Sequence, residues 1–412
     1  MLRVWLLLAL TCLVGVGCTV NEVIVAEETD LVVADAPVEE SRLLDIGVVE
    51  FAPGLDEDND PSESGVYEEI RFAETKYLAY HLKTTLQGTG HWGAVRVIPS
   101  REAFTDVIIS GEIGKSDGEF VEIAVTVEDA AGRRWYDKTY ETQTGVTSYS
   151  DRRDRRLDPY QKIFNDIAND LYAYAAQLPP KQLQQTRQIS ELRFFADMSP
   201  LAYNGYLSTD DDGLATVVRL PAESDPTVGR LRQIRERDRL VVDTLNEHYA
   251  NFYYGISMPY RDWRKVTRQE SVAYRQVKRS ARIQALVGVV IMAGALAADT
   301  DDSSSRQRRV NRGLQNLAIN EGFNRMMGGF YRGREAESHV AAIGELSESF
   351  GAQAAPMVIS VDGQERRLTG TAQAQYDGWR RLLREMYEAE TGFTQSIDVG
   401  VPARSVDDDE SN

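Results

Sequence analysis

Cysteine and histidine are the residues of this chain best suited to nucleophilic or metal chemistry, and both are rare. The chain has two cysteines, Cys12 and Cys18, and its four histidines lack the HxxxH or HxxEH spacing of a zinc hydrolase. It also lacks a GxSxG nucleophile elbow and a GxxxxGK[ST] phosphate loop. We therefore predict no catalytic residue, no metal site and no cofactor. The histidines, of which the first is expected on a helix surface, are His81, His91, His248 and His339.

Both cysteines lie in or beside an apolar N-terminal segment. Arg3 is the only charged residue before Glu22, residues 4–14 are almost entirely apolar, and Gly15-Val16-Gly17 precede Cys18. A positive start, a short apolar run and a small-residue cleavage site together predict a secretory signal peptide over residues 1–17. The apolar run is too short for a membrane-spanning helix.

The sequence LVGVGC, residues 13–18, resembles the lipobox of bacterial lipoproteins, with Gly15 where the family usually has Leu. In that family the cysteine thiol receives diacylglycerol and becomes the mature N-terminus, so the resemblance implies lipidation of Cys18. Thr19 is not the Asp that retains such proteins in the inner membrane. The resemblance then implies an anchor in outer-membrane lipid, on the periplasmic face. The alternative is a plain secreted protein with an unmodified Cys18.

Lipidation would leave the mature chain without a free thiol, because Cys12 leaves with the signal peptide and Cys18 is acylated. Thiol catalysis, CxxC redox chemistry and a cysteine-ligated metal are then excluded. The chain has 46 Lys and Arg against 64 Asp and Glu, a formal net charge of −18. Such a charge repels nucleic acid and anionic lipid, so we predict no nucleic-acid partner.

Changes in composition along the chain predict an α+β protein. Residues 18–42 carry seven acids and one base, which indicates an extended acidic tether. Residues 43–180 alternate strand and helix patterns and form a small mixed α/β domain. Residues 181–402 are mainly helical with one β-hairpin at 356–371, and residues 403–412 form a disordered tail.

The small α/β domain has a readable order of elements. DIGVVEF predicts a buried strand, a helical stripe from residue 67 ends at Gly88, and WGAVRVIP predicts a second strand. A hairpin follows with its turn at Asp129–Gly132, and a closing amphipathic helix ends before Pro179. The residues that share one face of the hairpin are Val121, Ile123, Val125 and Val127.

The pieces GVVEF, AVRVIP, TDVIISGEI and VTVEDAAGRRWYDKTYE resemble, in this order, the small α/β domain of CsgG-like and LpoB/TolB-N-like envelope lipoproteins. The type members are the curli secretion lipoprotein and the lipoprotein activator of penicillin-binding proteins. The most telling part is an apolar strand that ends at Gly111, followed by a hairpin with D-x-x-G at its turn. The resemblance covers roughly a third of the chain. It implies a domain that binds partners or oligomerises and has no catalytic residues.

The helical region contains an uncharged stretch at residues 283–298, rich in Gly and Ala. As a helix it would span about 24 Å, less than the roughly 30 Å of hydrocarbon in a bilayer. It is either a buried helix in a helical hairpin with residues 310–331 or a segment that inserts into a membrane or a ring. Pro259 is expected to interrupt the helix before it, and Asp210–Asp212 is read as a solvated turn rather than a calcium loop.

Aromatic side chains cluster in the same region, near Arg261 and Arg264. Aromatic and arginine side chains are enriched at protein interfaces, but part of the cluster also continues the apolar stripe of a helix. The cluster is therefore either a protein interface or core. Its members are Tyr249, Phe252, Tyr253, Tyr254, Tyr260 and Trp263.

Two functional hypotheses follow. The first is a lipid-anchored periplasmic scaffold or accessory protein of a cell-envelope machine, which works by binding an envelope partner or by homo-oligomerisation. The second is a periplasmic hydrolase that acts on peptidoglycan or glycan through a carboxylate pair. The missing nucleophile and metal motifs favour the first.

Overall fold

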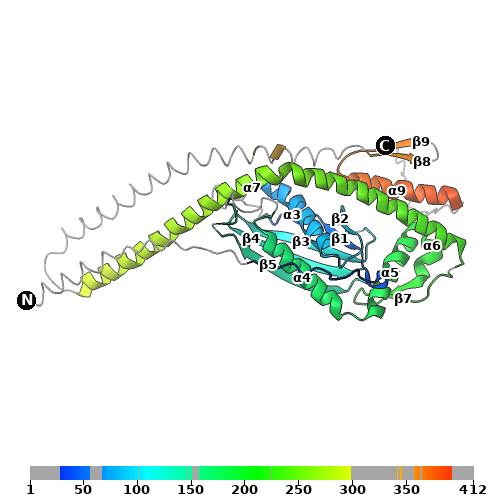
Figure 1. Ribbon diagram of the computed structural model, residues 1–412, viewed down its shortest axis with the longest axis horizontal. Coiled ribbons are helices and arrows are strands. Elements are labelled where there is room, and N and C mark those ends of the chain that lie inside the picture. Colours follow the sequence, from blue (N-terminus) through cyan, green and yellow to red (C-terminus); the bar gives the residue numbers. More distant parts are fainter. Residues whose placement is uncertain are drawn as a thin grey trace, which may run out of the picture.

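The computed structural model describes residues 28–55 and 67–297 (apart from 102, 146, 151–156 and 223), and then 341, 344–345, 357–361 and 364–391. Cys18, the partner segment 310–331 and the tail from 403 lie outside the described residues. The α+β fold class predicted from the sequence is confirmed (Figure 1).

A five-stranded mixed sheet forms the centre of the molecule, in the order β2-β1-β3-β4-β5. β1 is parallel to both of its neighbours, and the last three strands form an antiparallel meander. The strands follow the predicted alternation, and the four apolar residues expected on one face of β4 are all buried. The strands are β1 (Ile46–Val49), β2 (Val95–Ile98), β3 (Val107–Ser116), β4 (Phe120–Asp129) and β5 (Arg134–Gln143).

Two helices, α3 (Glu68–Thr89) and α4 (Gln161–Gln177), cover the face to which those residues point. The residue that closes helix α3 is Gly90, two residues later than the predicted Gly88. Gly90 takes the left-handed conformation, with φ of +69°, that closes a helix and that glycine adopts without a Cβ penalty. The core on this face also includes Phe252, Ile256 and Trp263 from the helical region.

The opposite side of the sheet packs on the remaining helices through a second core that contains Val97, Ile98 and Phe194. Both cores therefore join residues from either side of the predicted domain boundary at residue 180. The elements outside the sheet domain are α5 (Pro180–Met198), α6 (Pro200–Tyr203), η2 (Asn204–Tyr206), β6 (Leu207–Thr209), β7 (Ala215–Val217), α7 (Pro226–Ala297), β8 (Met357–Val361), β9 (Gln364–Leu368) and α9 (Ala372–Thr391).

Helix α7 is the longest element and runs across the molecule before it projects beyond it (Figure 1). The predicted interruption at Pro259 is wrong, because the helix continues through it. Proline removes one backbone donor and crowds the carbonyl four residues earlier. That residue is Gly255, and buried Ile256 and Tyr260 pack on the core around Pro259, which offsets the lost hydrogen bond.

The β8–β9 hairpin and α9 confirm the two C-terminal elements expected from the sequence, with the turn residues 362–363 outside the described part. Strand β7 begins at Ala215, and Asp210 closes the exposed turn before it by accepting the backbone N–H groups of Asp212 and Leu214. Among the described residues, no helix combines the length and apolar character that crossing a bilayer requires.

The described part of the predicted tether, residues 28–42, is not a free extended segment. Asn165 and Asn169 on α4 donate to the backbone carbonyls of Thr29 and Asp30, and the backbone N–H of Val32 donates back to Asn169. A short 3-10 helix, η1 (Glu40–Arg42), then leads into β1. The acidic composition of this segment indicated an extended tether. The contacts with α4 are made by backbone groups of the segment, which composition does not reveal.

Candidate functional site

The predicted aromatic cluster lies where α7 packs on the sheet domain. Tyr249, Tyr260 and Trp263 are almost fully buried and Phe252 is buried, whereas Tyr254 is 69% exposed. The core interpretation therefore holds for most of the cluster, because these side chains fill the joint between α7 and helix α3 within one chain. Only Tyr254 presents a large exposed aromatic surface. Tyr253 is half-buried and stacks on the ring of Tyr77 at 4.6 Å between centroids.

A buried ion pair lies at the centre of this joint. The guanidinium of Arg264 donates to both carboxylate oxygens of Asp158 at 2.8 Å, and the two side chains are only 1% and 4% exposed. Tyr77 donates a further hydrogen bond to Asp158, and the Tyr260 ring lies 4.1 Å from the Arg264 guanidinium carbon. Burial alone would raise the pKa of Asp158, but the charge and hydrogen bonds of Arg264 outweigh it and hold that pKa well below its usual range.

A second buried carboxylate, Glu74 of α3, joins the same region. It accepts hydrogen bonds from Ser116 and Tyr260 and pairs with Arg71 at 3.2 Å. Arg71 in turn donates to the backbone carbonyl of Ile113 on β3. Burial raises the pKa of Glu74, and Arg71 opposes this only in part. These bonds connect α3, β3 and α7. The register of α7 on the sheet is therefore fixed by hydrogen bonds and ion pairs as well as by apolar packing.

His81 also lies in this joint, not on a helix surface as expected. One ring nitrogen is 2.7 Å from the Tyr253 hydroxyl and the other is 2.8 Å from the side-chain oxygen of Gln161. Burial lowers the pKa of His81, which favours the neutral ring. A neutral, doubly hydrogen-bonded histidine is a structural group rather than a free base.

Polar contacts from α7 to the sheet domain recur every one or two helical turns along one stripe. On this stripe, the side-chain amide of Asn246 accepts the backbone N–H of Val97 and donates to the backbone C=O of the same residue. Val97 lies on β2, an edge strand, so the amide pairs the backbone groups that an edge leaves open. The stripe comprises Arg239, Asp243, Asn246, Tyr249, Tyr253, Tyr260, Arg264, Arg268 and Ser271.

The stripe ends at the tip of the β3–β4 hairpin. Gly118 in that turn has φ of +77°, and a Cβ there would lie 2.2 Å from the backbone oxygen of Arg264. Arg268 donates to Thr144, and Ser271 donates to the backbone oxygen of Asp117. Among the residues whose side chains the structure describes, Ser271 makes the hydrogen bond to the sheet domain that lies farthest along α7.

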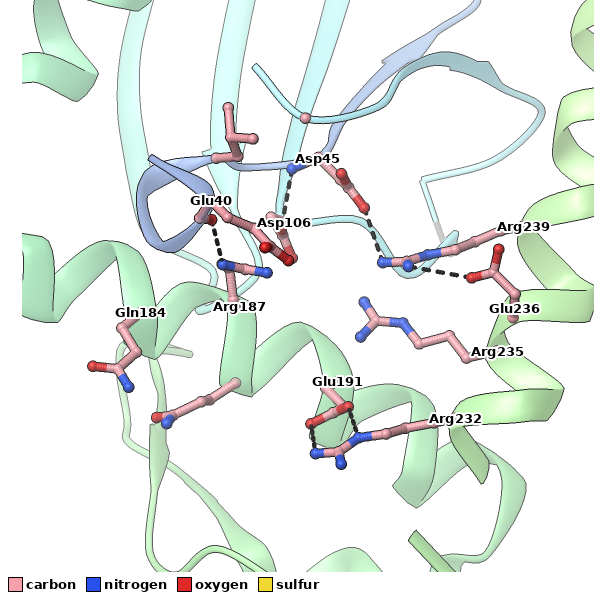
Figure 2. Close-up of a pocket in the computed structure, with 13 residues that line it drawn as sticks. Glu40, Asp45, Asp106, Gln184, Arg187, Glu191, Arg232, Arg235, Glu236 and Arg239 are labelled. Carbon is pink, nitrogen blue, oxygen red and sulfur yellow. Dashed lines mark hydrogen bonds and ion pairs between the residues drawn. The ribbon is translucent and has the colours of Figure 1, made fainter. Parts of the chain in front are cut away.

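A polar pocket of about 670 Å³ lies between η1, β1, α5 and the first turns of α7 (Figure 2). Three of its arginines are paired within the pocket wall. Arg187 donates to the backbone of Glu40, Arg232 pairs with Glu191, and Arg239 pairs with Asp45 and Glu236. We call this the junction pocket.

Arg235 points toward the middle of the junction pocket (Figure 2). It is 9% exposed and donates to Ser190, but its Nε has no hydrogen-bond partner among the described residues. Burial lowers the pKa of Arg235, and neighbouring Arg239 adds to the effect. The pocket lining has four arginines and five acids, and most of these side chains bond within its wall, so the arrangement holds η1, β1, α5 and α7 together rather than presenting an open binding surface.

Asp45 and Asp106 form the carboxylate pair of the junction pocket. Burial raises the pKa of Asp106, and the Asp45 carboxylate adds to the rise. Both side chains are engaged by the chain itself: Asp106 accepts the backbone N–H of Asp45, and Asp45 accepts the N–H of Ala94 together with Arg239. Within the described residues, no group of three or more His, Cys, Asp or Glu side chains is arranged to hold a metal ion.

Comparisons with known proteins do not identify a family for this chain. No protein-family model matches the chain, and no curated protein matches it. A PelC dodecamer from Paraburkholderia phytofirmans aligns with 39% of this chain and 98% of its own chain at 16% identity, with a TM-score of 0.16. A TM-score of 0.16 does not establish a common fold.

The sequence pointed to the aromatic members of the joint and to Arg264 beside them, but not to the acidic partner Asp158. Asp158 and Arg264 are 106 positions apart, and neither belongs to a local motif. The one available signal was position, since Arg264 and Arg268 extend the helical stripe begun by Tyr260. Arginines at an otherwise apolar, buried stripe indicate a buried acidic partner, although not which one.

Proposed function

We propose that this chain is a lipid-anchored periplasmic accessory protein of a cell-envelope machine, which works by binding a protein partner or a second copy of itself. Cys18 is its lipidated residue, outer-membrane lipid its anchor, and a domain of the CsgG-like and LpoB/TolB-N-like kind its body. Among its partners we expect no nucleic acid.

The observation that carries the proposal is the continuation of α7 beyond the body. We call residues 226–271 the docked half and residues 272–297 the arm. The arm continues as helix past Ser271 to Ala297 (Figure 1). At about 1.5 Å per residue it is about 39 Å long. A helix fixed to a body over many turns and continued away from it presents a rigid, oriented surface to another molecule.

The sequence of the arm supports binding. It has no charge from residue 283 to its end and is rich in Ala and Gly, which let helix backbones approach closely. Among the described residues of the body, most large apolar side chains are buried in the two cores.

Affinity purification after crosslinking in cells tests the binding function. We expect the full chain to recover one defined envelope complex or a homo-oligomer, and the double variant Leu286→Glu/Val290→Glu in the arm to lose it. Val218→Glu, at a residue of the body that is 60% exposed, is the matched control and should keep the complex. Loss in the control as well, or retention in the arm variant, would contradict the proposal.

The anchor has its own test. Cys18→Ser should release the chain from the envelope or stall its maturation, whereas an unchanged membrane fraction would contradict lipidation.

A hydrolase is the second candidate because Asp106 has a raised pKa and lies beside Asp45 in the junction pocket. Its carboxylate is bonded to the chain's own backbone, which favours a structural role. The purified chain should therefore release no soluble fragment from peptidoglycan. Fragment release that Asp106→Asn abolishes, in a variant with an unchanged melting temperature, would establish the hydrolase instead.

A further inference from the structure

A second pocket, on the other side of helix α5, has a different charge balance from the junction pocket. It has a volume of about 690 Å³ and lies between α5, α9, the loop after β2 and the β4–β5 turn. Its described lining contains five arginines and three aspartates, a formal excess of two positive charges in a chain of net charge −18. The arginines are Arg101, Arg193, Arg380, Arg381 and Arg384.

The inner arginines of this pocket are held in place. Arg380 is buried, pairs with Asp197 and lies 4.8 Å from the centre of the Phe104 ring. Arg384 bonds Asp197 from the next turn of α9, at 3.1 Å. The carboxylate of Asp197 is therefore shared by two guanidinium groups, and Asp238 lies 3.6 Å from Arg380 as a second carboxylate, so these two arginines are balanced within the chain.

The outer arginines carry the unbalanced charge. Neither Arg193 nor Arg381 forms an ion pair with any described residue. Partial burial lowers the pKa of Arg193, and nearby Asp129 opposes this only in part. Asp129 itself is occupied by Arg133 and by Trp135. Two guanidinium groups that form no ion pair with the described residues thus line one pocket from two different helices, α5 and α9.

We propose that this pocket binds the phosphate group of an organic phosphate or diphosphate. Guanidinium groups bond phosphate oxygens in pairs, and Arg193 and Arg381 can bond one phosphate group together, while the Asp377 carboxylate lies in the same lining. Phe104, Ile108 and Tyr376 give the pocket an apolar wall, and the volume exceeds what a free phosphate needs. The ligand therefore has an organic part, and its phosphate is either that of a soluble molecule or that of a lipid head group.

Calorimetric titration of the full chain with sodium pyrophosphate, at constant ionic strength, tests the proposal. We expect saturable binding, and a loss of about tenfold in affinity for each of Arg193→Gln and Arg381→Gln. Their melting temperatures should not change, because neither side chain holds an ion pair. Arg237→Gln is the matched control, since Arg237 is an exposed arginine outside this pocket, and it should bind pyrophosphate like the wild type.

Flotation with vesicles separates the two phosphate sources. A chain with Cys18→Ser that binds phosphatidic acid in phosphatidylcholine, but not phosphatidylcholine alone, and depends on Arg381, would identify a lipid head group. Pyrophosphate binding without vesicle binding would identify a soluble phosphate. No saturable binding to either probe, or equal affinities in Arg237→Gln and Arg381→Gln, would overturn the proposal.

Discussion

The docked half of α7 and its arm have the same helical backbone but opposite relations to the rest of the chain. The docked half carries a stripe of polar side chains that bond the sheet domain as far as Ser271. The arm carries its last charge at Arg282 and then only uncharged residues. The polar stripe therefore specifies the position of α7 as far as Ser271, and we propose that the arm beyond it serves another molecule.

The buried ion pair gives the sharpest contrast between the two halves. Arg264→Met would leave Asp158 buried without its partner, so we expect a loss of about 3–5 kcal/mol in the free energy of unfolding. Arg279→Met, the matched change in the arm, should cost under about 0.5 kcal/mol. Urea unfolding of the two variants measures the difference.

A double variant checks that the cost comes from the unpaired carboxylate. Arg264→Met combined with Asp158→Leu removes both charges, so it should recover much of the lost stability. A double variant no more stable than Arg264→Met alone would show that the pair is not the unit that holds the joint.

The hairpin tip tests how closely the docked half approaches the sheet domain. Gly118→Ala would place a Cβ against the Arg264 backbone at a φ of +77°, and we expect a loss of about 2–3 kcal/mol. Gly213→Ala is the matched control, because Gly213 has φ of +82° but no atom within 4 Å of a Cβ. It should lose only about 1 kcal/mol, from backbone strain alone. Equal losses in thermal unfolding would contradict close docking at Gly118.

The edge of the sheet offers a smaller effect. Asn246→Ala would leave the N–H and C=O of Val97 without the amide that bonds them, which should cost about 1–2 kcal/mol. Hydrogen exchange at the amide of Val97 should also become faster. An unchanged exchange rate would mean that α7 does not protect this strand.

The smallest expected effect is a dependence on pH through His81. Its pKa in the folded chain is below the ordinary value of 6.5, so the unfolded chain binds the proton more readily. Stability is therefore fully present above about pH 6.5 and is lost as the pH falls from there through the lower folded-state pKa. His81→Gln should flatten the fall in unfolding free energy between about pH 7 and pH 5. The same slope in the variant would assign it to other groups.

The sequence predicted the elements better than the contacts between them. Alternation at Val121 to Val127 and the amphipathic stripes of α3 and α9 depend on neighbours within a few residues, so local periodicity found them. The Asp158–Arg264 pair and the Asn246 amide on Val97 join residues more than a hundred positions apart, and no local pattern contains them. The predicted interruption at Pro259 was wrong for the same reason, because the packing that keeps α7 continuous comes from the sheet domain.

The charged pockets show the same limit. Arginines of α9 were visible as the polar face of an amphipathic helix, which is their ordinary role. Only the fold brings Arg381 to the same pocket as Arg193, where neither forms an ion pair with a described residue. The contacts of residues 29–32 could not be predicted from local composition, because the asparagines that bond them lie on α4, far along the chain.

Site-specific photo-crosslinking in cells tests the central claim, that the arm is the surface that binds. A photoreactive residue replaces Lys278 or Arg282 in the arm, and Glu141 or Lys181 at exposed positions of the body. The account predicts one discrete adduct, with an envelope protein or a second copy of the chain, from the arm positions and none from the body. Adducts from the body positions with none from the arm would contradict it.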